Sequence, residues 1–197
     1  MVPTLQGRLD PTKITVAGHS LGGHSAGMLL GATLKHPENG ETISLHDTRI
    51  KAGILLAAPG NGNSGADLSE MARDNPLYAI FRDPNFATMT TPTLVVVGDQ
   101  DLSSHLTVRG VDWHADPYAS SEGSKSLLTI VGGEHGLGGV AGWDAGETTD
   151  ESVERVAVVQ RMTWAYLRSV LFEGDKSWEE AQAALQGLEG LGSVESR

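Results

Sequence analysis

Residues 14–32 read ITVAGHSLGGHSAGMLLGA, and this stretch decides how the rest of the chain is interpreted. Its first residues are mostly β-branched or apolar, which predicts a short strand over 14–17. A helical pattern follows, and the motif G-x-S-x-G lies between the two at residues 18–22. This motif is typical of a strained strand-to-helix turn that lifts a serine hydroxyl above the end of a sheet. The stretch therefore predicts Ser20 as a nucleophile.

The composition fits one soluble domain over residues 1–197 and excludes several classes of partner and site. A net charge of −11 without a basic stripe argues against nucleic-acid and anionic-membrane binding. The chain has no cysteine, so disulfides, thiolate metal sites and cysteine nucleophiles are excluded. No apolar run is long enough to span a membrane, and no signal peptide follows Met1. We therefore expect a soluble protein, with a cytoplasmic location slightly favoured.

Strand-like and helix-like stretches alternate along the chain. Further strands are predicted at 50–58, at 92–97 and, as the last strand, at 126–131. Such alternation indicates an α/β fold, with a mostly parallel sheet flanked by helices and right-handed crossovers. The excursion over 60–91 contains a weak helical pattern around 68–79 and the aromatic residues Phe81 and Phe86. With its aromatics exposed, it suits either a substrate-facing cap or flap, or an ordinary surface loop.

Helix boundaries are predicted from local stop and start signals. The helix after Ser20 is expected to run to about Lys35, because HPENG at 36–40 supplies proline and glycine. TTDE at 148–151 matches a capping box and predicts a long helix to about Phe172, followed by a short one from Ser177. The tail from Gly190 is expected to fray. The apolar positions of the long helix are predicted to pack on the sheet: Val153, Val156, Ala157, Trp164, Leu167 and Leu171.

Residues able to act with Ser20 follow the later strands. Sites in open parallel sheets form beyond the carboxyl ends of the strands, where Asp99, Asp101 and His135 are expected. A serine needs a histidine to take its proton, and the histidine needs a carboxylate to orient it. Asp101 lies further into its loop and is favoured as that carboxylate. Asp99 is the less favoured candidate for that carboxylate, because it follows the strand directly and could instead fix the turn by bonding backbone amides.

Seven histidines compete for the role of base. His135 is favoured because it follows a strand and lies in a glycine-rich loop downstream of the aspartates. His19 and His24 flank the nucleophile and are expected to pack or line the cleft, whereas His36 and His46 are expected to be solvated. The other two, His105 and His114, show no partner pattern, and no histidine spacing suggests a metal site. The backbone N–H of Leu21 is expected to donate to an oxyanion.

Together these residues resemble the α/β-hydrolase superfamily. The form GHSLGG at 18–23 is similar to that of lipases and carboxylesterases. The segments LAAPG at 56–60, HLTVRG at 105–110 and GEHGLGG at 133–139 are similar to bacterial esterases near the chlorophyllase and dienelactone-hydrolase branch. The resemblance covers about residues 12–172. It implies no metal and no organic cofactor.

The chain departs from the superfamily ahead of Ser20. Several strands precede the elbow in that family, whereas here only one strand can. The resemblance therefore implies a fold truncated on its amino-terminal side, either as the carboxyl-terminal part of a longer hydrolase or as a short variant. The strand over 14–17 would then be a sheet edge able to pair with a second copy of the chain. The loop that usually supplies the second oxyanion donor would be missing.

These patterns predict a serine hydrolase that cleaves a small-molecule carboxylic ester through an acyl-enzyme on Ser20. His135 would shuttle the proton and Asp101 would hold His135. The alternative is a catalytically weak, truncated hydrolase that acts as a binding or assembly module.

Overall fold

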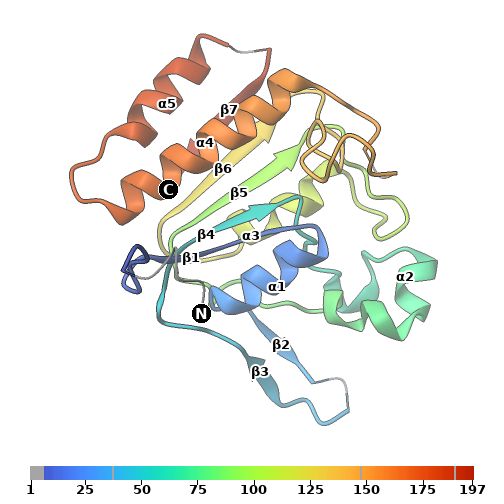
Figure 1. Ribbon diagram of the computed structural model, residues 1–197. Helices are drawn as coiled ribbons and strands as arrows, with labels where there is room; N and C mark the ends of the chain where they lie inside the picture. The colour runs from blue at the N-terminus through green and yellow to red at the C-terminus, as the bar shows by residue number, and fades with distance from the viewer. Residues whose placement is uncertain (1–6, 37, 147, 189) are drawn as a thin grey trace.

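A computed structural model describes residues 7–36, 38–146, 148–188 and 190–197. A twisted five-stranded sheet forms its centre, and four of its strands run parallel (Figure 1). The spatial order is β1 (Ile14–His19), β4 (Ile50–Leu56), β5 (Thr93–Gly98), β6 (Lys125–Ile130) and β7 (Gly192–Ser196). The predicted α/β class with a mostly parallel sheet flanked by helices is therefore confirmed.

The interior strands are apolar on both faces because helices cover both. Alternate side chains point to opposite sides of a strand. Leu55 and Val95 face the helices α1 (Leu21–Leu29) and α3 (Asp116–Ala119), while Ile54 and Leu94 face α4 (Val153–Leu171) and α5 (Ser177–Gln186). Figure 1 shows these helix pairs on opposite sides of the sheet. None of the described helices is both long and apolar enough to cross a membrane.

The helix after Ser20 is shorter than predicted. It ends at Leu29, and the chain then forms an antiparallel pair of short strands, β2 (Thr33–Lys35) and β3 (Thr42–Ser44). Gly31 has a φ of +114°, which an α-helix does not allow and a glycine adopts at little cost. The predicted stop signal therefore lies in the turn of a hairpin. Its Pro37 lies outside the described residues.

The tail was expected to fray but forms a fifth strand. β7 runs antiparallel to β6, so residues 126–131 are not the last strand. The hydroxyl oxygens of Ser126 and Ser196 lie 2.8 Å apart across the pair. Pairing satisfies backbone groups that β6 would otherwise leave open, and this gain does not depend on an apolar pattern in the tail.

The long helix α4 begins later and buries a different face than predicted. Ser152 caps it, with its Oγ accepting a hydrogen bond from the backbone N–H of Arg155, rather than the predicted capping box. Its buried residues are Val158, Val159, Met162, Ala165 and Tyr166. Val153 and Trp164 of the predicted stripe are 65% and 59% exposed. The sheet lies under one flank of the helix, and the remaining predicted positions are only half-buried.

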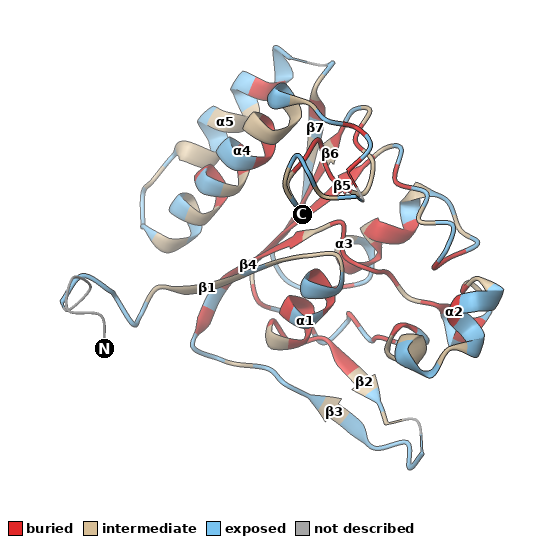
Figure 2. Cartoon of the chain, turned by 45° about the vertical axis from the view of Figure 1, so that its right-hand side comes forward, coloured by how far each residue is buried: buried red, intermediate tan, exposed pale blue. Residues whose placement is uncertain are grey.

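The excursion over 60–91 packs tightly on the core. Its predicted helix is broken into α2 (Glu70–Asp74) and the 3₁₀ helix η3 (Pro76–Phe81), after the 3₁₀ turn η2 (Asn63–Gly65). Phe81 and Phe86 are 2% and 5% exposed, so the expectation of exposed aromatics is wrong. Phe81 joins a small core with Leu68 and Trp113. Figure 2 shows buried segments beside α2. Trp113 belongs to η4 (Val111–Ala115), a 3₁₀ helix after β5.

Candidate active site

Ser20 lies on a strained turn between β1 and α1. Its φ of 54° and ψ of −122° are outside the regions that side-chain-bearing residues favour. The turn is held by a 2.9 Å hydrogen bond from the backbone N–H of Ser20 to the carbonyl of Leu56 in β4. Gly18 makes the turn possible, because a Cβ there would lie 2.0 Å from the carbonyl oxygen of Gly22. Glycine at this position lets the strand pass against the helix that follows.

The structure brings Ser20, His135 and Asp101 together in one hydrogen-bonded chain. The Oγ of Ser20 lies 2.8 Å from Nε2 of His135. On the other side of the ring, Nδ1 of His135 lies 2.8 Å from Oδ2 of Asp101. A carboxylate only accepts, so Nδ1 carries a proton and Nε2 is free to accept the serine proton. This is the arrangement that a serine nucleophile with a histidine base requires.

The loops after β5 and β6 are locked together, which places Asp101 and His135. The backbone N–H of Gln100 donates to the carbonyl of Gly133 at 2.9 Å. Gly98 permits this approach, since a Cβ there would lie 2.1 Å from the same oxygen. Asp99 accepts a 2.7 Å hydrogen bond from the backbone N–H of Gly132. Asp99 therefore fixes the turn, as the alternative interpretation of this residue predicts, and Asp101 faces His135.

Asp101 is 2% exposed and has two further polar partners that sequence reasoning missed. Ser103 donates from Oγ to Oδ1 of Asp101 at 2.7 Å, and Nε2 of His114 lies 3.2 Å from Oδ2. Burial opposes ionisation of the carboxyl, but the hydrogen bonds from His114 and His135 outweigh it and lower the pKa of Asp101 well below its usual range. No sequence pattern links His114 to Asp101, because their contact depends on how η4 packs against β5 after the connecting loop.

The other histidines are distributed as follows. His19 lies beside the site, with Nε2 at 2.7 Å from the carbonyl oxygen of His135. His24 is buried in α1 and packs edge-on against Phe81, with ring centres 5.3 Å apart, and burial lowers the pKa of His24 to about 4. His46 is exposed and His36 half-buried, both away from the triad on the β2–β3 side. His105 lines an open hollow beside His135.

One group among the described residues carries donors that a metal ion could use. These are Asp101, His114 and His135, whose ligand atoms lie within 4.8 Å of one another. The same atoms satisfy each other at hydrogen-bond distance, since both histidine nitrogens reach Oδ2 of Asp101, at 2.8 and 3.2 Å. The arrangement is therefore accounted for by proton-sharing contacts between the three side chains.

The fold, but no family, is found among known proteins. No protein-family model and no curated protein matches the chain. Similar solved structures include a truncated carbohydrate esterase from gut microbiota, at 16% identity and a TM-score of 0.45, covering 66% of this chain and 55% of that one. A puromycin hydrolase mutant complexed with PGG matches at 14% identity and a TM-score of 0.53, and the match covers 85% of this chain and 23% of that one. Esterase 2 from Thermogutta terrifontis in its apo form matches at 18% identity and a TM-score of 0.41, and the match covers 93% of this chain and 58% of that one.

These neighbours are hydrolases by their printed names, and most of those found are esterases. At such identities the likeness concerns the fold, and of the three described above the puromycin hydrolase is the one with a TM-score above 0.5. The chain spans less than two thirds of the length of each of these proteins.

Proposed function

We propose that the protein is a serine hydrolase of carboxylic esters, with Ser20 as nucleophile, His135 as general base and Asp101 as the carboxylate that orients His135. The observation that carries the proposal is the continuous chain of hydrogen bonds from Ser20 through His135 to Asp101, with both links at 2.8 Å. The strained backbone of Ser20 supports it, because strain of this kind concentrates at functional sites.

The reaction follows from these contacts. Oγ of Ser20 attacks the ester carbonyl carbon while Nε2 of His135 takes the hydroxyl proton, and a tetrahedral oxyanion forms. Leu21 is the first residue of α1, so its backbone N–H has no acceptor within the helix and can donate to this oxyanion. The intermediate collapses, the alkoxide leaves with the proton from His135, and an acyl-enzyme remains. Water, deprotonated by His135, then releases the acid and restores Ser20.

A fluorophosphonate probe tests the nucleophile directly. The expected result is one covalent adduct, mapped by peptide mass spectrometry to Ser20, and hydrolysis of a p-nitrophenyl ester that Ser20→Ala abolishes. Ser25→Ala is a matched control, because Ser25 is an exposed serine of the same helix whose hydroxyl donates to the carbonyl of Leu21. Absence of labelling in folded protein, or activity that survives Ser20→Ala, would overturn the proposal.

A second candidate function is favoured by the edge of the sheet. Among the described residues β1 pairs with β4 alone, so one side of its backbone is open. A groove beside this edge is lined by Ala17, Leu56, Trp143 and Leu167. A catalytically weak module that pairs with a second copy through β1 would use this surface. Ala17→Lys would then dissociate a dimer in sedimentation while leaving probe labelling unchanged, whereas a monomer in both forms argues against the module.

A further inference from the structure

His114 is a second histidine on the carboxylate of the candidate triad. It lies in η4, its side chain is 0% exposed, and its ring centre is 5.8 Å from that of His135. The ring of Trp113 packs edge-on against that of His114, with the ring centres 5.1 Å apart. Because a buried polar group must find its hydrogen-bond partners within the protein, the partners of the two ring nitrogens decide the protonation state of His114.

Both ring nitrogens of His114 face oxygen atoms that accept hydrogen bonds. Nδ1 lies 2.9 Å from the carbonyl oxygen of Ala58, which can only accept. Nε2 lies 3.2 Å from Oδ2 of Asp101, which as a carboxylate oxygen also only accepts. The remaining neighbour of Nε2 is Oγ of Ser103 at 3.1 Å, and the single proton of that hydroxyl is donated to Oδ1 of Asp101 at 2.7 Å. A proton on each ring nitrogen satisfies every one of these contacts.

We propose that His114 is a positioning residue, held as an imidazolium, that fixes the Asp101 carboxylate and balances its charge against His135. The proposal rests on the proposed function, since it assigns His114 a role in the same site. An imidazolium beside Asp101 leaves the resting pair neutral in the interior, where an unpaired charge would be costly. Ser103 holds the other carboxylate oxygen of Asp101 through its hydroxyl. Its φ of 40° is another strained backbone position at the site.

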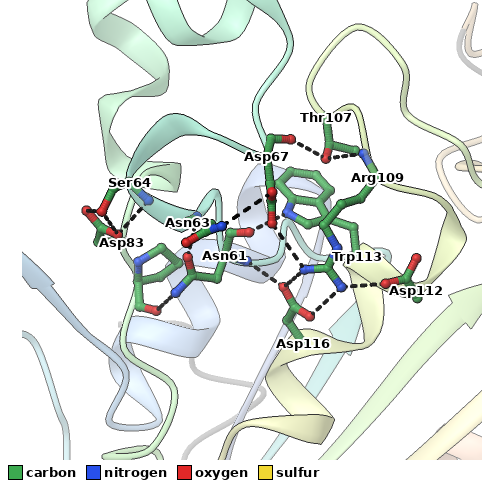
Figure 3. Close-up of polar contacts among 11 residues, drawn as sticks. Asn61, Asn63, Ser64, Asp67, Asp83, Thr107, Arg109, Asp112, Trp113 and Asp116 are labelled. Atoms are coloured by element: carbon green, nitrogen blue, oxygen red, sulfur yellow. Dashed lines mark hydrogen bonds and ion pairs between the residues drawn. The ribbon is translucent and has the colours of Figure 1, made fainter.

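The 3₁₀ helix η4, which carries His114, is anchored on both sides of this residue. Figure 3 shows Arg109 reaching both oxygens of Asp116, at 2.8 and 3.0 Å, and also Asp112. Nε1 of Trp113 donates to the carbonyl of Asn61 at 2.9 Å, which ties η4 to the excursion. These contacts hold the segment on either side of His114.

The acidic groups near His114, apart from Asp101, are paired with Arg109. β5, against which η4 packs, has no titratable side chain, and the loops after β5 and β6 bring Asp101 and His135. On η4 and α3, Asp112 and Asp116 are both paired with Arg109. Asp101 is therefore the acid that directly contacts His114.

A charge on His114 predicts a shift in the pH profile when it is removed. Without the imidazolium, Asp101 acts on His135 alone, so protonation of His135 becomes easier and the base is lost at a higher pH. In His114→Gln and His114→Phe the acid limb of kcat/KM should move up by about one pH unit. The value of kcat should fall about 10- to 100-fold with KM little changed, because a hydrogen bond to a charged group is lost. His36→Gln, on the distant hairpin, is the matched histidine control.

The state of His114 is also measurable without turnover. In ¹⁵N-histidine-labelled protein carrying Ser20→Ala, both ring nitrogens of His114 should show the chemical shifts of an imidazolium. A neutral ring, or a pH limb that stays in place in both folded variants, would overturn the proposal while leaving labelling of Ser20 intact. If Ser20 is not labelled but the ring is charged, the ion pair stands, and both the proposed function and the positioning role fail.

Discussion

The two sides of the candidate site are built on very different parts of the sheet. Ser20 ends the edge strand β1, whose residues are half-buried or exposed, whereas Asp101 and His135 follow the interior strands β5 and β6 (Figure 2). All residues of β5 are buried. His135 and Asp101 are thus held by the core, while Ser20 is held by β4 on one side and by the start of α1. Apart from removal of the Ser20 hydroxyl itself, changes at the interior side should therefore be the more damaging ones.

Apart from removal of the Ser20 hydroxyl itself, the largest effect on activity is expected from the buried carboxylate of Asp101. Asp101→Asn keeps the shape but removes the charge that orients His135, and the same amide substitution in a Ser-His-Asp triad costs about 10⁴ in kcat. A fall of that order in ester hydrolysis is expected here, with the protein still folded by circular dichroism. Asp99→Asn is the matched control, because Asp99 bonds the turn at Gly132 and should cost less than about tenfold. Equal losses in the two variants would contradict the assignment.

A smaller contrast is expected in stability. Leu128 in β6 is 0% exposed, so Leu128→Ala should lower the free energy of unfolding by about 3–5 kcal/mol, since it leaves a cavity in the core. Ile14 in β1 is half-buried, and Ile14→Ala should cost about 1 kcal/mol. Urea unfolding of both variants measures the difference. Similar losses would mean that the edge strand is covered in solution, as pairing with a second copy would produce.

The fold class and the grouping of Ser20, Asp101 and His135 were accessible from the sequence. Strand ends in a parallel sheet lie at one edge, so residues that follow different strands meet there. His114 was not accessible in this way. It reaches Asp101 through a 3₁₀ helix whose path depends on the Arg109 contacts and on the packing of Trp113, and neither has a periodic signature.

The remaining errors also come from tertiary contacts. The sequence predicts a helix that continues from Ser20 across Gly31, but a positive φ at Gly31 redirects the chain into a hairpin. The predicted buried face of α4 is wrong because a sheet ending at β1 covers only part of the apolar surface of that helix, which leaves Trp164 exposed. β7 gains its place from backbone pairing with β6, which polar residues can make as well as apolar ones.

The last contrast is between two buried histidines, one on each side of the site. His114 faces Asp101, whereas His24 on α1 packs against Phe81, and burial lowers the pKa of His24 to about 4. The folded protein then keeps His24 neutral while the unfolded chain binds a proton below about pH 6.5, so stability should fall as the pH drops from 6.5 to 4. The free energy of unfolding should fall by up to about 3 kcal/mol over this range. Asp101 adds its own loss below about pH 4, outside this window, because its pKa is lowered from an unfolded value of about 3.9.

His24→Leu removes this titration and keeps an apolar group against Phe81. Urea unfolding at pH 7 and pH 4.5 should show a smaller loss of stability in the variant than in the unchanged chain. His46→Leu, an exposed histidine, is the control and should keep the full loss. If His24→Leu keeps the full loss as well, protonated His24 must be accommodated beside Phe81. The acid loss would then come from another group, and burial of His24 against Phe81 would not set the acid stability of the Ser20 side of the site.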